Sequence, residues 1–192
     1  MKKKIVVCLI GQTGAGKDTV AGELVKHTGW KKIVSYTDAP KRSDQQNGRE
    51  HWFMSREEMT RILKEKDILA ETAINGNRYC TTLDQLSDGI SIYIIDPKGF
   101  DELDKRNDLT LIPCVIIAGR AIRKKRASSR KNFDFDSRNT SEEKQFEEFY
   151  VRVRKAECRD DAWPTAFFGN TGTPEECADD ILRYVKMGLE EE

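Results

Sequence analysis

The chain has 192 residues, of which 34% are charged, and its 33 basic residues balance 33 acidic ones to a formal net charge of zero. This length suits one domain with a sizeable core, and the charge balance gives no general reason to expect nucleic acid or an anionic membrane as a partner. No apolar run reaches the roughly 18 residues that a membrane-spanning helix needs. Five scattered cysteines without a C-x-x-C pair favour reduced thiols in a cytoplasmic protein.

The first predicted element is a strand buried on both faces, because Ile5–Ile10 is continuously apolar and a glycine follows it. A helix is predicted over 17–27, where apolar residues share one face and Gly29 supplies a stop. A short second strand is expected at 31–36. Residues 37–51 are polar and rich in turn formers, which predicts a loop or a hairpin.

A capping box opens the next predicted helix, since Ser55 is followed three residues later by Glu58. Two strands, 68–74 and 77–82, are then joined through Asn75-Gly76. The remaining patterns predict, in chain order, a strand at 90–95, a short helix at 101–105, a strand at 109–118, a basic segment at 120–131, a charged helix at 142–157 and a last helix capped by Thr173. Core strands that alternate with helices indicate a parallel α/β sheet.

The most informative motif is the run Gly11-Gln12-Thr13-Gly14-Ala15-Gly16-Lys17-Asp18-Thr19, a phosphate-binding P-loop. It follows a buried strand and opens a helix, which is the context in which this motif is meaningful. Glycines let the backbone amides turn toward phosphate oxygens, and the start of the helix adds partial positive charge. Lys17 supplies a full charge for the terminal phosphates. All nine residues are therefore predicted to bind ATP.

One position departs from the usual P-loop, because Asp18 stands where a serine or threonine normally ligates Mg²⁺. A carboxylate is a hard oxygen ligand, and Thr19 adds a neighbouring hydroxyl, so both are predicted to hold Mg²⁺ directly or through water. Asp96 closes the predicted strand at 90–95, at the edge where open α/β sheets bind ligands. An equally good alternative is that Asp96 caps a turn before Pro97.

Further motifs, in their order and spacing, resemble those of the guanylate kinase family over about residues 4–186. They are Gly11–Thr19, Ser35-Tyr36-Thr37, Arg42, Asn47-Gly48-Arg49-Glu50, Phe53–Glu58, Gly76-Asn77-Arg78-Tyr79, Asp96, Gly99, Arg126, Arg130 and Arg152. The resemblance implies one domain over 1–192, with a three-layer P-loop parallel sheet core, an inserted NMP-binding subdomain and a helical lid. The implied core covers about 1–33, 89–122 and 146–192, the insert about 34–88, and the lid about 123–145.

The resemblance also implies roles for individual side chains. Arg42 and Tyr79 correspond to residues that hold the acceptor phosphate, Ser35 and Thr81 to hydroxyls that face the base, and His51 to a residue lining the acceptor pocket. Arg126, Arg130 and Arg152 correspond to the arginines that clamp the migrating phosphoryl group and act as catalytic residues with Lys17, and Asn170 lies where the family borders adenine. The basic run that contains Arg126 and Arg130 also fits a solvated helix face.

Several family positions are replaced. An arginine of the family aligns with Ala39, a threonine with Asp38, and the glutamate that reads guanine with Ala70. Glu71 follows directly, and a one-residue bulge could bring it into that place. These substitutions leave the acceptor base open.

The residues and the resemblance together predict ATP-dependent phosphorylation of a nucleoside monophosphate, with GMP or dGMP as the first expectation. The alternatives are a kinase for a different (deoxy)nucleoside monophosphate or another phosphate ester, and a non-catalytic binding module of guanylate-kinase-like fold. Mg²⁺ and ATP are the expected cofactor and co-substrate, and a monomer or homodimer is the expected assembly.

Overall fold

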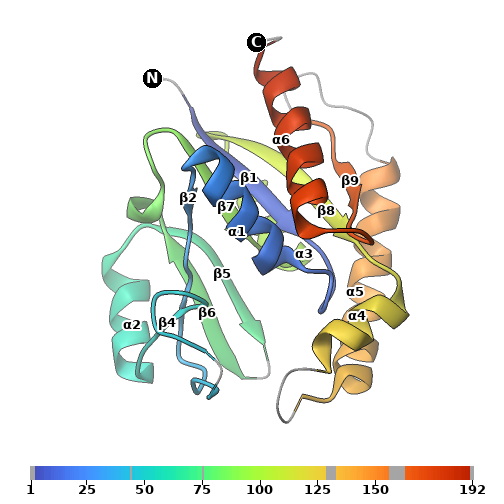
Figure 1. Cartoon of the computed structure of the whole chain (residues 1–192). Helices are drawn as coiled ribbons and strands as arrows, with labels where there is room; N and C mark the ends of the chain where they lie inside the picture. The colour runs from blue at the N-terminus through green and yellow to red at the C-terminus, as the bar shows by residue number, and fades with distance from the viewer. Residues whose placement is uncertain (1–2, 44, 75, 129–132, 156–162, 191–192) are drawn as a thin grey trace.

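The computed structural model describes residues 3–43, 45–74, 76–128, 133–155 and 163–190. Within these residues the strands form two sheets, a larger one at the centre of the molecule and a smaller one beside it (Figure 1). The chain passes directly from one sheet to the other. After the first helix it forms one strand of the large sheet, and its next strand belongs to the small sheet.

The large sheet has the strand order β2-β7-β1-β8-β9, and each adjacent pair is parallel. Its members are β2 (Lys31–Lys32), β7 (Ile90–Ile94), β1 (Lys4–Ile10), β8 (Leu109–Ile117) and β9 (Ala166–Gly169). The parallel α/β sheet expected from the alternation of strands and helices is therefore confirmed. Because both faces of the sheet are covered at β1, its residues Val6–Ile10 are buried on either side, which explains their unbroken apolar sequence.

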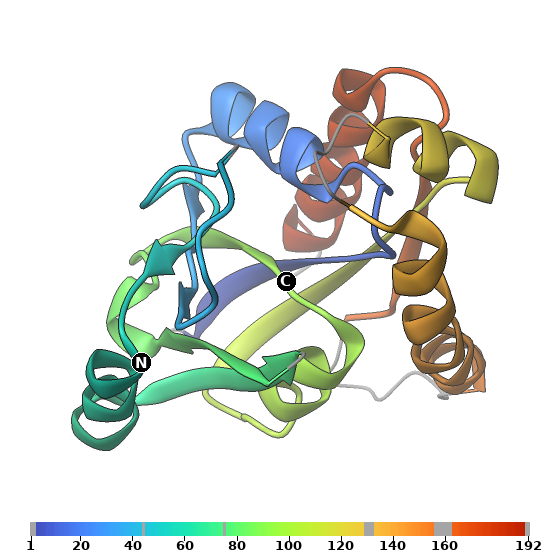
Figure 2. The ribbon, with the colours of Figure 1, turned by 90° about the horizontal axis from the view of Figure 1, so that it is seen from below.

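Helices cover both faces of this sheet, so the core has three layers (Figure 2). On one face α1 (Lys17–Thr28) and α6 (Pro174–Glu190) pack over the β1 residues Val7 and Leu9. The opposite face of β1 packs against two other helices. These are α3 (Pro97–Leu103) and α5 (Phe135–Lys155), whose Phe100, Leu103, Phe146 and Phe149 join Val6, Cys8 and Ile10 in one apolar cluster.

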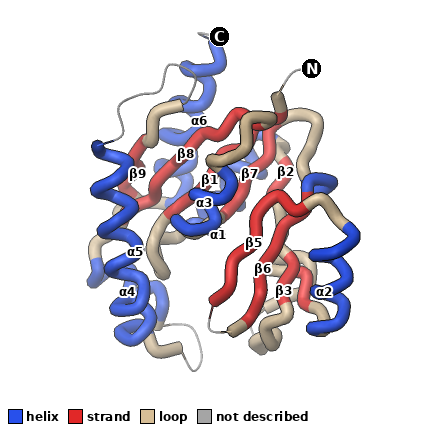
Figure 3. Tube along the Cα trace, turned by 180° about the vertical axis from the view of Figure 1, so that it is seen from behind, coloured by secondary structure: helices blue, strands red, loops and turns tan. Residues whose placement is uncertain are grey.

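The small sheet has the order β4-β3-β6-β5 and carries one helix, α2 (Arg56–Glu65), beside it (Figure 3). Its strands are β4 (Trp52–Phe53), β3 (Tyr36–Thr37), β6 (Asn77–Thr82) and β5 (Ile68–Ile74). A 3₁₀ turn at Leu83–Gln85 follows β6 in the chain. The predicted capping box is present, because the hydroxyl of Ser55 accepts from the Glu58 amide and the Glu58 carboxylate accepts from the Ser55 amide.

Four predicted elements differ from the structure. The strand expected at 31–36 is divided, since β2 pairs with β7 in the large sheet and β3 pairs with β6 in the small one. The helix expected at 101–105 is α3, which begins at Pro97 because the Asp96 carboxylate accepts from the amides of Lys98 and Gly99 at 2.9 and 3.0 Å.

The other two differences lie toward the C-terminus. The helix expected at 142–157 is α5, which begins seven residues earlier at Phe135 and is described as far as Lys155. The basic segment forms α4 (Arg120–Ala127), whereas 129–132 lies outside the described residues. Strand β9 was not predicted, because its four residues include a glycine and have no period of their own.

Candidate functional site

The P-loop turns from the end of β1 into the first turn of α1. Gly14 and Gly16 have φ angles of 81° and 96°, in the left-handed region that favours glycine, and Gly16 is the N-cap of α1. The Asn170 side chain also comes so close that only glycine fits at position 16, because a Cβ there would lie 2.4 Å from Asn170 Nδ2. The loop is therefore shaped by its glycines to bring backbone amides around a small anion.

A cavity of about 580 Å³ opens at this loop, beyond the carboxyl end of β1. This is the edge at which open parallel sheets bind their ligands. Lys17 reaches back along it, and its Nζ donates to the carbonyl of Gly11 at 2.6 Å. The lining residues are Thr13, Gly14, Gly16, Lys17, Asp18, Thr19, His51, Arg126, Arg138, Asn170 and Pro174.

Asp18 and Thr19 both line the cavity, as a metal site in the P-loop would require. The Asp18 carboxylate accepts from Lys32 Nζ at 3.0 Å and its side chain is 63% exposed. Within the described residues, no group of three histidine, cysteine or acidic side chains could hold a metal ion unaided. One carboxylate and one hydroxyl fit Mg²⁺ that is bound mainly through phosphate oxygens and water, which is its usual mode in kinases.

Two arginines reach the cavity from the α4–α5 side. Arg126 on α4 donates from Nη1 to the Asn170 carbonyl at 3.0 Å and to the Ala15 carbonyl at 3.3 Å. Arg138 on α5 was not among the predicted site residues, and its Nε donates to Glu142 Oε1 at 2.6 Å. The available sequence signal was the four-residue spacing of Arg138 and Glu142, which places both on one helix face.

Of the other two predicted arginines, only Arg152 falls within the described residues. Arg152 lies further along α5, where its Nη1 donates to Asp101 on α3 at 2.8 Å and its guanidinium covers the Phe149 ring. Arg152 is absent from the cavity lining. Arg130 lies outside the described residues.

His51, directly before β4, also lines the cavity. Its Nδ1 shares a 2.8 Å hydrogen bond with the Ser35 hydroxyl, and its ring makes an edge contact with Tyr79 at 5.3 Å. Burial lowers the pKa of His51 below its ordinary value, and the positive charges of Lys32 and Arg42 act in the same direction. At neutral pH this imidazole is therefore uncharged, although the nearby Asp18 and Glu50 oppose the shift.

Thr81, predicted to face the base, is fully buried. Its hydroxyl donates to Tyr93 at 2.9 Å, so in this structure it joins the small sheet to β7. Arg42, predicted to hold the acceptor phosphate, is exposed on the loop after β3, where its amide donates to Gln45. Asp96 accepts from the first amides of α3, as its capping alternative requires.

The β5–β6 register decides where Glu71 points. Ala70 pairs with Thr81 and Glu71 pairs with Cys80, after a register shift between Ile68 and Ala70. Paired residues of antiparallel strands share a face, and Cys80 lies on the face of α2, where its Sγ is 3.5 Å from Met59 Sδ. Glu71 is therefore exposed on the α2 face, and the buried Ala70 occupies the other face.

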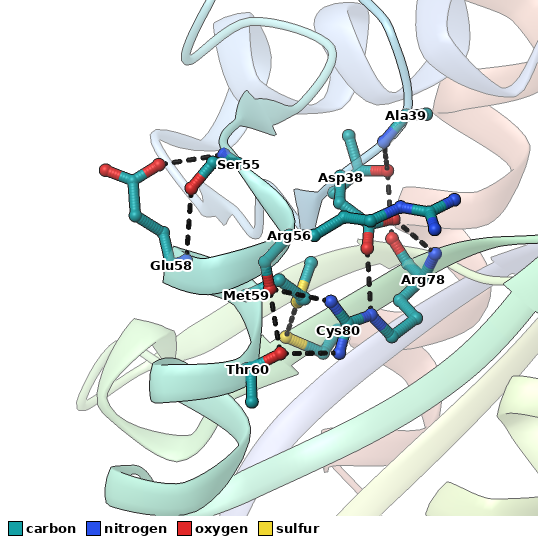
Figure 4. A network of polar contacts seen from close by, with 10 residues as sticks. Asp38, Ala39, Ser55, Arg56, Glu58, Met59, Thr60, Arg78 and Cys80 are labelled. Atoms are coloured by element: carbon teal, nitrogen blue, oxygen red, sulfur yellow. Dashed lines mark hydrogen bonds and ion pairs between the residues drawn. The ribbon is translucent and has the colours of Figure 1, made fainter.

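An ion pair with a buried carboxylate fixes the turn after β3 (Figure 4). The Asp38 side chain is 1% exposed, and it accepts from the Arg78 amide at 2.6 Å and from Arg78 Nε at 2.8 Å. The same guanidinium donates to the Thr60 hydroxyl and the Arg56 carbonyl of α2. The residue that replaces a family threonine thus has a structural partner in this chain.

Asn170 follows β9 and is 1% exposed. Its amide donates to Ile117 and its Nδ2 to Ala15, both at 2.8 Å, which ties β9 to β8 and to the P-loop. Its Oδ1 has no hydrogen-bond partner in the part of the chain that the structure describes. A buried acceptor without a partner is costly, so this atom is a point at which the structure is not fully satisfied.

A parallel sheet with helices on both faces, a glycine-rich loop after its first strand and a polar cavity at that loop together define a P-loop nucleotide-binding α/β protein. The sequence model of the guanylate kinase family matches residues 2–108. The chain belongs to the guanylate kinase family, and the predicted family resemblance is confirmed.

Individual relatives match over shorter segments. The guanylate kinase of Clostridium tetani is 35% identical over 81 residues, which are 42% of this chain and 39% of that protein. The human guanylate kinase is 35% identical over 78 residues, 40% of each chain. The chain thus matches about two fifths of the length of these relatives.

Solved structures extend the likeness in fold to nearly the whole chain. The guanylate kinase of Anaplasma phagocytophilum superposes with a TM-score of 0.62 at 18% identity, covering 97% of this chain and 86% of that one. The protein TT1252 from Thermus thermophilus gives a TM-score of 0.54 at 16% identity, with coverages of 98% and 99%. In the described residues, no helix combines the length and apolar composition that crossing a membrane requires.

Proposed function

We propose that this protein transfers the terminal phosphoryl group of ATP to a nucleoside monophosphate, with GMP or dGMP as the first candidate acceptor. The observation that carries the proposal is the shared cavity, in which the P-loop, two arginines and His51 of the insert face one space. A donor phosphate and an acceptor phosphate brought into that space from opposite sides can react in line.

On the donor side, the loop amides and Lys17 bind the triphosphate. Lys17 Nζ exchanges its bond to the Gly11 carbonyl for phosphate oxygens, so it is already positioned within the loop it serves. Arg126 and Arg138 bring two further positive charges to the cavity and offset the charge that spreads over the transferred group. Mg²⁺, when bound near Asp18 and Thr19, neutralises part of the phosphate charge.

On the acceptor side, the small sheet and its loops are the proposed NMP-binding insert, about 34–88, and α4 with the start of α5 the proposed lid, about 123–145. His51, held by Ser35 and Tyr79, lines the cavity, and this supports a role for it in binding the acceptor. Arg42 reaches the acceptor phosphate if the exposed loop after β3 moves toward the cavity. Because a phosphate acceptor is already ionised, no general base is required.

The decisive experiment is a turnover panel in which ATP and Mg²⁺ are combined with each ribo- and deoxyribonucleoside monophosphate. Wild-type protein should phosphorylate at least one of them, and Lys17→Ala should lower that rate by at least about 100-fold while the circular dichroism spectrum stays unchanged. Lys26→Ala is the matched control, because Lys26 lies on the same helix but is exposed and paired with Glu23. Near-normal turnover by Lys17→Ala would refute the proposal.

The same panel separates the alternatives. Transfer to a base other than guanine would agree with the buried Ala70, which presents no carboxylate to a guanine. A non-catalytic binding module would show no turnover with any acceptor. If ATP with Mg²⁺ did not raise the melting temperature, a nucleotide site would be excluded altogether.

A further inference from the structure

The tip of the P-loop is attached to helices α4 and α5 through one residue, Thr13. Its amide donates to Glu142 Oε2 at 2.8 Å, and its hydroxyl donates to Glu142 Oε1 at 2.7 Å. Its carbonyl accepts from Arg123 Nη1 at 3.2 Å. Each polar group of Thr13 is therefore bonded to a side chain more than a hundred residues away in the sequence.

Glu142 is a buried carboxylate with an unusual set of donors. The residue is 7% exposed, and Arg138 Nε adds a third hydrogen bond, at 2.6 Å, to the two from Thr13. A buried charge is costly unless it is paired and hydrogen-bonded, and these three donors meet both conditions. Arg138 in turn lines the cavity, whereas Glu142 is not among the lining residues. Glu142 thus does not line the cavity itself, but it is hydrogen-bonded to Thr13 and Arg138, which do.

Arg123 forms the second half of this attachment. It is 5% exposed, it donates to the Ala118 carbonyl and to Asn139 Oδ1 as well as to Thr13, and it lies over the Phe135 ring. The loop also touches the α4 backbone, since a Cβ on Gly14 would lie 2.4 Å from the Arg123 carbonyl oxygen. Both helices therefore meet the P-loop without an intervening solvent layer.

We infer that Glu142 is a positioning residue of the phosphate site, which fixes Arg138 and the P-loop tip in one geometry through a single carboxylate. This inference rests on the proposed function. The P-loop amides and an arginine from a separate helix have to converge on the same phosphate group, and a carboxylate shared between them sets their separation before the nucleotide arrives. Preorganised donors of this kind are more effective than donors that must move during the reaction.

A neutral isostere tests the charge and the geometry together. Glutamine at position 142 keeps one acceptor oxygen, but its NH₂ group is a donor and replaces the other oxygen. One hydrogen bond from Thr13 and the ion pair with Arg138 are therefore lost. Glu142→Gln should lower kcat by about 10- to 100-fold and weaken ATP binding, while the acceptor KM stays within about twofold, because the acceptor side is formed by the other sheet. Glu147→Gln, an exposed position on the same helix, is the matched control and should match wild type.

A merely structural role predicts a different result. It would lower the melting temperature and the folded fraction, but kcat per folded molecule, counted by the stoichiometry of ATP binding in calorimetry, would be unchanged. A positioning role also predicts non-additivity: Arg138→Ala in the Glu142→Gln background should cost at most about twofold beyond the slower single variant. If the fold-losses in kcat of the two single variants multiplied in the double variant, the inference would be overturned.

Binding measurements keep the two proposals separable. If no monophosphate is phosphorylated, the proposed function fails, yet Glu142→Gln should still bind ATP with Mg²⁺ roughly tenfold more weakly than wild type. If wild type catalyses transfer and Glu142→Gln does so equally well, the positioning role is overturned and the proposed function stands. If wild type binds no ATP at all, both are overturned.

Discussion

Replacing Asp38 by alanine would remove the carboxylate that holds the turn after β3 to strand β6. In the native protein this carboxylate accepts two hydrogen bonds from Arg78, one from its amide and one from its guanidinium. The Asp38 side chain is 1% exposed and that of Arg78 is 29% exposed (Figure 4). The variant therefore leaves a half-buried guanidinium and a backbone amide without their anion.

The expected loss of stability follows from that geometry. Breaking a fully buried ion pair on one side costs about 3–5 kcal/mol. Arg78 retains its bonds to Thr60 and Arg56 and some contact with water, which places Asp38→Ala toward the lower end, at about 3 kcal/mol. For a chain of this size that loss corresponds to a fall in Tm of roughly 6–12 °C.

The measurement is equilibrium unfolding in urea, with thermal unfolding as a second probe. Asp88→Ala is the matched control, since the Asp88 side chain is fully exposed and 3.6 Å from Lys4 Nζ; isolated surface pairs are worth little, so no measurable change is expected. A double variant, Asp38→Ala with Arg78→Ala, should be less unstable than the sum of the single variants, because no unpaired charge remains.

The pH dependence gives an independent check. Burial alone would raise the pKa of Asp38, but the hydrogen bonds from Arg78 and the charges of Arg78 and Arg56 lower it below its ordinary value. The stabilisation is therefore complete above the unfolded-state pKa of about 3.9 and is lost as the pH falls through the lower folded-state pKa. Wild type and Asp38→Asn should differ equally at pH 7 and pH 5.5. A loss below about 1 kcal/mol, or a difference that disappears already at pH 5.5, would refute the reasoning.

Three further predictions concern the site and its surroundings. Gly14→Ala should weaken ATP binding by at least about tenfold in calorimetry, because φ is 81° and the new Cβ would meet the Arg123 carbonyl at 2.4 Å; unchanged affinity would contradict the loop geometry. Arg152→Ala should leave kcat within about twofold of wild type and lower the free energy of unfolding by less than about 1 kcal/mol, since Arg152 forms a surface pair with Asp101 away from the cavity. A large fall in kcat would show that α5 moves during catalysis. The NMR titration midpoint of His51 should lie below 6.5, so that the unfolded chain binds more protons and stability falls as the pH drops below about 6.5; a midpoint above 6.5 would contradict its burial.

Much of the candidate site could be predicted because it is encoded locally. The buried strand β1, the glycines of the loop and helix α1 are consecutive in the chain, so their order and spacing define the loop before any tertiary contact forms. The capping box at Ser55 is local in the same sense, and it is present in the structure.

The division of the strand predicted at 31–36 results from partner choice between distant segments. The sequence of 31–36 is compatible with one strand, but its two ends find different partners, β7 and β6, and so belong to different sheets. Neither of these strand partners can be read from the local pattern. Helix α5 begins at Phe135 because the Asp134 carboxylate caps it by accepting from the Ser137 amide at 3.1 Å, which is a local signal that the prediction missed.

For this protein, the order of residues alone determined the P-loop, the alternation of strands and helices, and the family to which the chain belongs. Tertiary structure decided which charged groups reach the cavity: Arg138 lies there beside Arg126, and Arg152 pairs with Asp101. It also decided that Thr13 is held by Glu142 and Arg123. The physical reason is that helices α4 and α5 carry arginines at several positions, and only packing against the sheet and the loop selects those that face the cavity.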